Sequence, residues 1–543
     1  MHGGRAVTSR IVAKEVPPHS NSLGPENKLI IAPGLLTGTP APCSARLSIG
    51  AKSPLTGGIK ESNVGGRFSF QLARNGIRGI IIEGQARDWF LLEIRNGECK
   101  INPASCYVGL GNYELTQQLL KAYGDNCGIL SIGPAGERQY LGASINSIDL
   151  QGYPSRAAAR GGLGSVMGSK KLKAIIIHPP LRNQVKIQDW DKFIAVSKPL
   201  AQNLAVSRTY FSQFGTSNMV DTVNEVNGIP TLNYKFGKFD GVNQINGKSL
   251  DDWVKKYGGK KRVACSPGCV IRCSNVVLDK EGTHATSSLE YETMAMNGAN
   301  LGIGNLEFLL YMDHFYDDFG LDSIELGGAI GVAMEGEHLP FGNEAVIREL
   351  VGEIREGTEK GRLIANGVAS IGKYLGVKRL PVVKGQGMPA YDPRVFKAMG
   401  VTFATSPQGA DHTAGPAIKG RRAYGYKDYG ELDQEPQKLE LSKELQVFIA
   451  MMDALGFCYF VGPNYEQAVT SVKLVNAMYN WHWTIDDIIM WARATIQVEV
   501  DFNIAAGITK KDNFLPEFFR IELLPNTRHK FGIPQKDLEN IWD

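Results

Sequence analysis

The chain has 543 residues, enough for about three or four domains, and its 43% hydrophobic and 21% charged composition is typical of a globular protein. The 59 basic and 55 acidic side chains leave a net charge of +4, which gives no reason to expect nucleic acid or an anionic membrane as a partner. The stretch MHGGRAVTSR lacks the apolar core of a signal peptide, and no run approaches the ~18 apolar residues of a membrane helix. We therefore expect a cytoplasmic protein with no membrane and no nucleic-acid partner.

The first third of the chain predicts a β-rich domain. Short apolar runs are bounded by Gly, Pro and Asn, and one of them carries the Asn96-Gly97 pair typical of a tight hairpin. The domain is expected to span residues 1–183. Its predicted strands lie within 27–36, 76–84, 89–104, 126–134 and 171–180.

From about Asp189 the apolar residues recur three and four apart, a pattern that predicts amphipathic helices. A break near VVKGQGMPAYDPR separates two mainly helical domains, 184–381 and 382–543. The sequence therefore predicts an α+β protein with a β-rich domain followed by two mainly α-helical ones. The clearest helical segments are 305–320, 343–361 and 442–456.

Three cysteines share the loop ACSPGCVIRCSN in the spacing C-x3-C-x3-C: Cys265, Cys269 and Cys273. In a reducing compartment such a cluster indicates metal ligands or redox groups before disulfides. A tetrahedral thiolate site needs a fourth ligand, and Cys458 is a candidate. Both a [4Fe–4S] cluster and zinc accept four thiolates, so the spacing leaves both open. Most of the remaining thiols are expected to be buried and structural: Cys43, Cys99, Cys106 and Cys127.

Two predicted helices end in the same motif, Asp-x-x-Gly-apolar-Asp/Cys, at Asp317–Asp322 and Asp453–Cys458. The glycine is expected at the left-handed position that ends each helix. The aspartate in the last turn faces the negative end of the helix dipole, which costs ~0.3–1 kcal/mol. A solvated helix end explains either copy alone, but two copies favour a paired site for a ligand edge made of N–H donors.

Two glycine-rich stretches, 34–69 and 155–175, combine backbone donors with basic side chains that include Arg156 and Arg160. Such a surface suits a flat, anionic, phosphate-bearing ligand. Turn chemistry alone explains many glycine-rich loops, so these stretches are weak indicators by themselves.

Together with LGPENKLI, SIGPAGE, AYDPR and ATSPQGADH, these blocks resemble the aldehyde:ferredoxin oxidoreductase family, in the same order from about Gly3 to the C-terminal region. The resemblance implies a tungsten or molybdenum bis-pyranopterin cofactor beside one [4Fe–4S] cluster. It implies a first domain that cups two pterins and two helical domains that each supply one aspartate motif. The implied reaction oxidises an aldehyde to a carboxylic acid and passes electrons through the cluster to ferredoxin or a dedicated iron–sulfur subunit.

The resemblance also implies which residues hold the cofactor. Asp317 and Asp453 would accept hydrogen bonds from the amino edges of the two pterins, and Arg46 would lie between cluster and pterin. The residues expected to line the pterins are Leu321 and Asp322 for one, and Gly456 and Phe457 for the other. The implied cluster ligands are Cys265, Cys269, Cys273 and Cys458.

The pterin phosphates match the stretches SNVGG and SRAAAR. The backbone carbonyls of Asn63 and Ala157 would hold a Mg2+ ion that bridges the two phosphates, and Arg156 would add positive charge. The implied cofactor-binding set is completed by Gly65, Gly66 and Arg160.

Glu292, in LEYETMAMNGANLG, and His412, in GADH, stand at the family's acid/base positions. Proton transfer at a carbonyl needs an acid/base close to it, and burial would raise the pKa of a glutamate toward neutral pH. The simpler interpretations are a helix N-terminal charge for Glu292 and a packed loop histidine for His412. Glu290 is the neighbouring, less favoured candidate.

The sequence departs from the family pattern in several places. The cysteine loop is usually C-x2-C-x3-C, and an apolar Phe457 replaces the usual leucine. Some members bridge a dimer with a metal held by Glu-x-x-His, but the matching positions are Tyr311 and His314, so we expect no such metal. The chain begins close to its Gly-Gly-Arg block, so we also expect the family's first strands to be missing and sheet edges to be left unpaired.

Two other functions stay open. The same scaffold could reduce a carboxylic acid or an aromatic thioester with partner electron-transfer subunits. A non-catalytic iron–sulfur electron-transfer or assembly subunit is the third hypothesis, although Glu292, His412 and both aspartate motifs are all present. The sequence does not fix the small-molecule substrate, the metal or the oligomeric state, for which a homodimer is one option.

Overall fold

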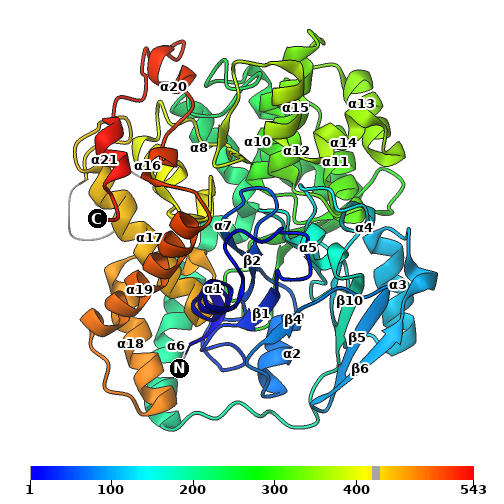
Figure 1. Ribbon diagram of the computed structural model, residues 1–543, viewed down its shortest axis with the longest axis vertical. Coiled ribbons are helices and arrows are strands. Elements are labelled where there is room, and N and C mark those ends of the chain that lie inside the picture. Colours follow the sequence, from blue (N-terminus) through cyan, green and yellow to red (C-terminus); the bar gives the residue numbers. More distant parts are fainter. Residues whose placement is uncertain (1, 419–428) are drawn as a thin grey trace.

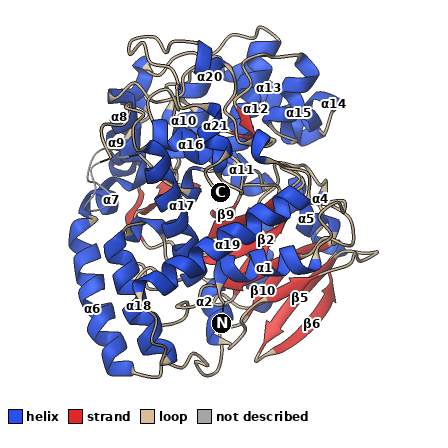
Figure 2. Ribbon diagram, turned by 60° about the vertical axis from the view of Figure 1, so that its left-hand side comes forward, coloured by secondary structure: helices blue, strands red, loops and turns tan. Residues whose placement is uncertain are grey.

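The structure is a computed structural model that describes residues 2–418 and 429–543. Figure 1 shows two sheets from the first third of the chain in the lower part of the molecule, with one group of helices above them and a second group beside them. Figure 2 shows the same division, with the large strands gathered in the lower half and helices around them. The predicted α+β class is confirmed.

The first domain contains a four-stranded antiparallel sheet and a six-stranded mixed sheet. In spatial order the first sheet holds β3 (Ile59–Val64), β2 (Leu47–Lys52), β1 (Leu29–Pro33) and β4 (Ile80–Ile82). The second holds β6 (Glu98–Pro103), β5 (Phe90–Arg95), β10 (Leu172–Ile177), β7 (Gly128–Ser131), β8 (Ile145–Ser147) and β9 (Arg156–Ala158).

All five stretches predicted to contain strands do contain them. Strands β5 and β6 form the predicted hairpin, and both Asn96 and Gly97 take positive φ angles, 53° and 84°, as a tight two-residue turn requires. Strand β10 lies between β5, to which it is parallel, and β7. All six of its residues are buried, which explains its continuous apolar run.

Helix α1 (Gly4–Glu15) packs against β1 and β2. The outer edge of β3 is also protected. Asn503 accepts a hydrogen bond from the Ile59 N–H (2.8 Å), and Gln408 accepts one from the Glu61 N–H (2.5 Å). In the described part of the chain β3 is an end strand of its sheet, as expected, but two of its outward N–H groups are satisfied by these side chains.

The helices of the remaining chain pack in two groups, joined by the largest apolar core, which includes Tyr291, Met294, Phe403 and Phe519. The first domain also contributes α2 (Phe68–Arg74), α3 (Asn112–Tyr123), α4 (Pro134–Glu137) and α5 (Leu163–Ser169). The middle part of the chain contains α6 (Trp190–Ser207), α7 (Thr209–Phe214), α8 (Met219–Glu225), α9 (Gly247–Tyr257), α10 (Tyr291–Asn297), α11 (Leu306–Phe319), α12 (Ser323–Gly336), α13 (Glu344–Glu356), α14 (Glu359–Ala365) and α15 (Val368–Leu375). Of these, α6 packs with the C-terminal group, against α18 (Tyr465–Tyr479). The C-terminal group contains α16 (Lys397–Thr405), α17 (Lys438–Leu455), α18 (Tyr465–Tyr479), α19 (Ile485–Ala505), α20 (Phe518–Ile521) and α21 (Gln535–Glu539).

The three predicted helical segments correspond to α11, α13 with the start of α14, and α17. The sequence analysis missed two small sheets in this region. They are β11 (Gly259–Val263), β12 (Ser274–Leu278) and β13 (His284–Ser287), and the pair β14 (Val382–Val383) and β15 (Gln386–Gly387). The cysteine loop lies between β11 and β12, so this small sheet anchors both of its ends.

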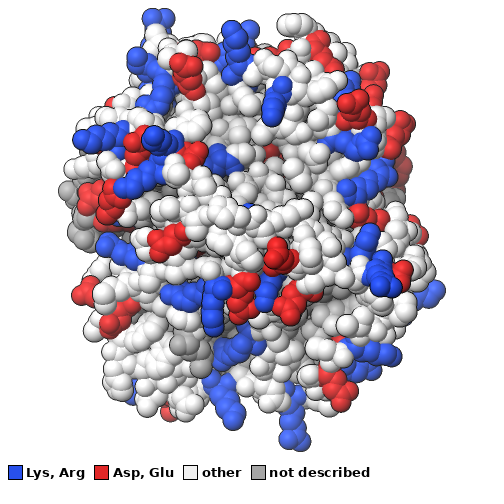
Figure 3. Space-filling model, viewed as in Figure 1, with Lys and Arg blue, Asp and Glu red and all other residues white. Residues whose placement is uncertain are grey.

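Basic and acidic side chains are interspersed on the face seen in Figure 3, as the small net charge suggests. Within the residues that the structure describes, no helix combines the length and apolar character needed to cross a bilayer.

Gly320 ends α11 in the left-handed conformation (φ 77°), and a Cβ there would lie 2.8 Å from the backbone nitrogen of Gly133. Gly376 ends α15 in the same conformation (φ 65°) but with open space around it. We expect Gly376→Ala to cost the ~1–2 kcal/mol of left-handed backbone strain alone. Gly320→Ala should cost a further ~1–3 kcal/mol from the clash. Calorimetry should show the larger fall in melting temperature for Gly320→Ala, and equal falls would contradict this account.

Candidate active site

The first aspartate motif is joined to the first domain by backbone hydrogen bonds. The Asp322 N–H donates to the Gly142 carbonyl (2.9 Å), and the Ser144 N–H donates to the Gly320 carbonyl (2.9 Å). The side chain of Asn112 holds the Asp317 carbonyl from the same side (2.9 Å). The end of α11 is thereby fixed to the strand that leads into β8.

The second motif is joined to the first domain in the same manner. The Leu35 N–H, just after β1, donates to the Ala454 carbonyl (3.1 Å), and the Arg46 N–H donates to the Gly456 carbonyl (3.0 Å). A Cβ on Gly34 would lie only 2.1 Å from the Gly456 nitrogen. Glycine is therefore required where this backbone meets the turn after α17.

Between these contacts lies a cavity of about 470 Å3. It brings together residues from all three parts of the chain. The sequence-predicted residues that line it are Arg46, Gly65, Arg156, Ala157, Cys265, Cys273, Glu292, Asp317, His412 and Cys458. The other predicted residues are absent from its lining: Asn63, Gly66, Arg160, Cys269, Leu321, Asp322, Asp453, Gly456 and Phe457.

Glu292 and His412 face each other in this cavity. Glu292 lies in the first turn of α10, and the Ala390 N–H donates to its Oε2 (2.9 Å). Its Oε1 lies 3.4 Å from Nδ1 of His412, and neither of these buried atoms has a hydrogen-bond partner among residues 2–418 and 429–543. Burial raises the pKa of Glu292, and the nearby His412 offsets only part of this shift. The two atoms are therefore available to a molecule in the cavity.

Arg46 lies between the cysteines and the second aspartate motif. Its charge acts on Cys265, Cys458 and Asp453, and a Cβ at Gly65 would lie 3.0 Å from its Nη1. The guanidinium donates to the side chain of Asn63 and to its carbonyl (3.2 Å), the same carbonyl that is predicted to hold magnesium.

Arg156 is the clearest candidate for binding an anion. It donates to Ser274 and lies 3.6 Å from Glu290, while its buried Nε has no partner in the described residues. Ser147 Oγ is likewise buried without a partner there, and it lies 2.3 Å from where a Cβ on Gly66 would be. An anion bound here could accept hydrogen bonds from the Nε–H of Arg156 and the hydroxyl of Ser147.

Arg160 and Asp322 bind each other (3.0 Å). Arg160 also contacts Glu325 (3.2 Å) and donates to the Ala410 carbonyl (2.7 Å). It therefore ties the first aspartate motif to the loop that carries His412. Asp322 was predicted to line a pterin and Arg160 to belong to the cofactor-binding set, and both roles stay predictions.

The cysteine loop and Cys458 lie close together. Cys43, which was expected to be a structural thiol, lies beside them. The thiol of Cys269 contacts both Cys265 and Cys43, and the Cys43 backbone bridges Gly268 and Cys458 (3.0 and 2.8 Å). In the described part of the chain, no three His, Cys, Asp or Glu side chains form a group that could hold a single metal ion. Of the four thiols that were mostly expected to be buried, Cys43 and Cys127 are buried, whereas Cys99 and Cys106 are exposed.

Sequence reasoning also missed Asp313, which lines the cavity one helical turn before Asp317. Burial raises the pKa of Asp313 to about 7, although the hydrogen bond that it accepts from the Thr286 hydroxyl (2.7 Å) acts to lower it. The spacing of four residues was the available signal, because it places both carboxylates on one face of α11. The hydroxyl of Tyr113 lies 3.4 Å from Asp317, and its ring stacks on His314 (4.3 Å).

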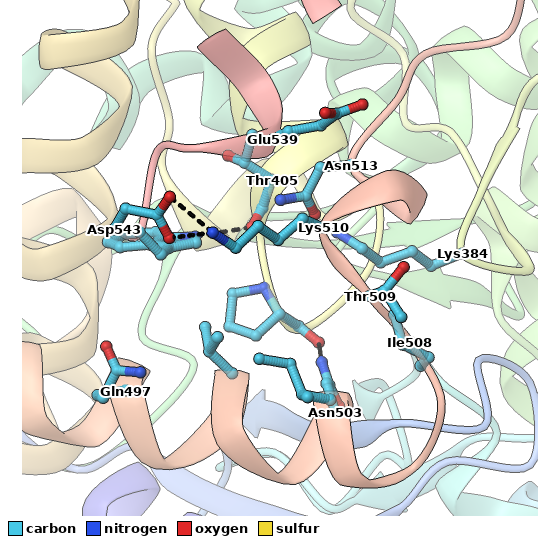
Figure 4. A pocket seen from close by; sticks show the side chains of 14 residues that line it. Lys384, Thr405, Gln497, Asn503, Ile508, Thr509, Lys510, Asn513, Glu539 and Asp543 are labelled. Atoms are coloured by element: carbon cyan, nitrogen blue, oxygen red, sulfur yellow. Dashed lines mark hydrogen bonds and ion pairs between the residues drawn. The ribbon is translucent and has the colours of Figure 1, made fainter. Parts of the chain in front are cut away.

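A smaller cavity of about 100 Å3 lies between α19 and the last residues of the chain (Figure 4). Lys510 and Asp543 form an ion pair at its edge (2.6 Å). Burial lowers the pKa of Lys384 to about 7, and its amine donates to two backbone carbonyls (2.7 and 3.1 Å). None of the predicted site residues lines this cavity, so the chemistry is assigned to the larger one.

Comparison with known proteins agrees with this geometry. The family model described as aldehyde ferredoxin oxidoreductase, N-terminal domain, matches residues 1–179, and the model for domains 2 and 3 matches residues 195–542. The chain belongs to the aldehyde ferredoxin oxidoreductase family. It is similar to oxidoreductases throughout its length, which confirms the resemblance seen in the sequence.

Individual members show how far the similarity extends. The tungsten-containing aldehyde ferredoxin oxidoreductase of Pyrococcus horikoshii is 33% identical over 97% of this chain and 88% of its own. The WOR-like subunit of the aliphatic sulfonate oxidoreductase of Pyrococcus furiosus is 29% identical over 86% and 76%. The fold resembles the active-site complex BamBC of benzoyl coenzyme A reductase in complex with 1,5-dienoyl-CoA (TM-score 0.81, 20% identity, 99% and 88% covered).

The loop that carries His412 depends on a buried ion pair. Nζ of Lys60, which is fully buried, lies 2.8 Å from Asp411. Burial acts to raise the pKa of Asp411, but Lys60, His412 and Arg160 together lower it below its usual range. We expect Lys60→Met to destabilise the protein by ~3–5 kcal/mol at pH 7, because it leaves a buried carboxylate without its partner.

The pH dependence gives a second check on this prediction. A carboxyl pKa that is lowered in the folded state stabilises the fold at pH above the unfolded pKa. In Lys60→Met this stabilisation shrinks, because the pKa of Asp411 is then lowered only by His412 and Arg160, against burial. The loss in free energy of unfolding, relative to the wild type, should therefore be largest at pH 7 and should shrink as the pH falls to ~4 and below. Lys192→Met is the matched control: its ion pair with Asp189 (2.7 Å) is exposed, so its loss should lower the melting temperature far less. Equal melting temperatures for the two variants at pH 7 would contradict the role of Lys60.

Proposed function

We propose that this protein is a tungsten- or molybdenum-pterin oxidoreductase that oxidises an aldehyde to a carboxylic acid. The observation that carries the proposal is the shared cavity, which holds Glu292 and His412 together with Asp317 and two of the loop cysteines. A residue pair for proton transfer, a carboxylate for an N–H-bearing ring and thiols for a cluster are the parts that this reaction needs.

The residues fit a bis-pyranopterin with phosphate groups. The unpartnered Nε of Arg156 and Oγ of Ser147 suit a phosphate, and Gly65 and Gly66 leave room where a Cβ would clash. Strands β3 and β9 lie side by side, which supports the proposal that the carbonyls of Asn63 and Ala157 share a Mg2+ ion. When bound, the cofactor would supply the two-electron oxidation itself.

Four thiols supply a donor set for a [4Fe–4S] cluster, for which Cys265, Cys269, Cys273 and Cys458 are the proposed ligands. A guanidinium at Arg46, close to Cys265, Cys458 and Asp453, stabilises negative charge on both sides. These contacts support the proposal that Arg46 lies between cluster and pterin.

The chain's own part in the reaction is to bind the carbonyl and to move protons. Aldehyde and water give the acid, two protons and two electrons. Because the Ala390 N–H holds Oε2 of Glu292, Oε1 stays directed at His412 and the cavity. The raised pKa lets Glu292 hold a proton nearer neutral pH than an exposed glutamate does. Glu292 accepts a proton from the hydrated carbonyl, and His412 passes it on.

The electrons are proposed to leave one at a time through the cluster to ferredoxin or to a dedicated iron–sulfur subunit. The same residues serve the reverse reaction, the reduction of an acid, because proton transfer is reversible at Glu292. A non-catalytic role receives less support, since an electron carrier has no need for the Glu292 and His412 pair.

Glu292→Gln tests the acid/base assignment. The variant should keep its shape and its hydrogen bond to Ala390 but lose aldehyde-dependent reduction of a viologen dye by about 10²–10⁴-fold. Its tungsten or molybdenum and its iron should stay at wild-type levels. Glu290→Gln is the matched neighbour and should retain far more activity. Full activity in Glu292→Gln would sink the assignment.

Metal analysis of anaerobically purified protein tests the cofactor. We expect about one tungsten or molybdenum with four irons, the content of one metal pterin and one [4Fe–4S] cluster. Cys458→Ala should lose cluster iron, whereas Cys43→Ala, which removes a nearby thiol outside the proposed ligand set, should retain it. Iron alone would favour the electron carrier, and a single zinc would refute both. If Cys43→Ala loses the iron and Cys458→Ala keeps it, the ligand set is wrong.

A further inference from the structure

A buried arginine at the start of the chain holds the second aspartate motif. Arg5, in the first turn of α1, donates from Nε and Nη2 to the two carboxylate oxygens of Glu499 on α19 (2.8 Å each). Its remaining nitrogen, Nη1, donates to Oδ2 of Asp453 at the end of α17 (3.3 Å). The side chains of Arg5 and Glu499 are 3% and 0% exposed. Figure 1 shows α1 beside α17 and α19, with all three next to the first sheet.

The residues before Arg5 allow this contact. Gly4 has a φ of 45°, and a Cβ there would lie 2.1 Å from the Asp453 carbonyl oxygen. A Cβ on Gly3 would lie 2.5 Å from the Leu35 nitrogen. Any larger residue would push α1 away from the last turn of α17. The Gly-Gly-Arg sequence therefore brings the guanidinium to Asp453 and keeps it there.

Glu499 orients the guanidinium. Both of its oxygens bind Arg5, and Oε1 also accepts a hydrogen bond from Ser9 (2.7 Å). A planar guanidinium held at two nitrogens has little freedom left, so the direction of its third nitrogen is set. That nitrogen takes one oxygen of Asp453 and leaves the other, Oδ1, for a different donor.

Asp317, the equivalent residue of the first motif, is held differently. Among the residues that the structure describes, its side chain accepts a hydrogen bond from the neutral Tyr113 hydroxyl, at 3.4 Å. The two motifs are alike in sequence, but only the second is anchored by a buried cation from another helix. Arg5 is therefore specific to one half of the site.

We propose that Arg5 is a positioning residue for the cofactor: it fixes Oδ2 of Asp453 so that Oδ1 accepts an N–H group from the edge of one pterin. The inference rests on the proposed function, since it assumes a heterocycle with N–H donors at Asp453. The competing explanation is purely structural, namely that Arg5 only neutralises the buried Glu499.

A double substitution separates the two explanations. Arg5→Met alone should lower the melting temperature, because Glu499 is left as an unpaired buried charge. Arg5→Met with Glu499→Leu removes both charges and should restore the melting temperature. If Arg5 positions Asp453, the double variant should still carry about tenfold less tungsten or molybdenum per four irons than the wild type, the usual scale for loss of an outer-shell partner.

Adding Asp453→Ala to the double variant completes the test. Asp453→Ala alone should show the same loss of tungsten or molybdenum, and the triple variant should lose no more, because both changes remove one interaction. Wild-type content of tungsten or molybdenum in the double variant would overturn the role of Arg5, as would fully additive losses. A wild-type protein that holds iron but neither tungsten nor molybdenum would instead refute the proposed function, and the role of Arg5 with it.

Discussion

The site depends on two backbone contacts between helix ends and the first domain. At Gly320 and at Gly456 a left-handed turn ends a helix and is hydrogen-bonded, main chain to main chain, to the sheet domain. The first contact brings Asp317 to the lining of the cavity, and the second holds the turn that follows Asp453 against the first domain. The cysteine loop depends on the second contact as well, since the Cys43 backbone bridges Gly268 and Cys458.

The proposed acid/base pair, Glu292 and His412, comes from two other segments of the chain. Glu292 comes from α10, whereas His412 comes from a loop tied down by Lys60 and Arg160, both of which belong to the first domain. A buried cation in each case replaces the hydration that the loop carboxylate and carbonyls lose. The first domain thus contributes more than cofactor contacts, because it also determines where the histidine of the C-terminal group lies.

The sequence predicted most of what is local and much of the site. Strands such as β10 and helices such as α11 follow from apolar periodicity, and the residues implied by the resemblance largely meet in one cavity. What it could not predict is pairing over long separations. Arg160 is a predicted cofactor-binding residue, and its ion pair with Asp322 was not foreseen. Cys43 was expected to be an isolated thiol, yet it lies beside Cys269. Neither of these contacts can be predicted from the spacing of neighbouring residues in the sequence.

The glycine contacts at Gly34 and Gly133 also bear on how the protein can move. Main chain meets main chain there, with no side chain between the two surfaces to change rotamer. A contact of this kind has one packing geometry, so the two surfaces cannot shift past each other by changing side-chain rotamers. The distance between the two motif aspartates is therefore a fixed dimension of the fold, and any ligand that bridges them must match it.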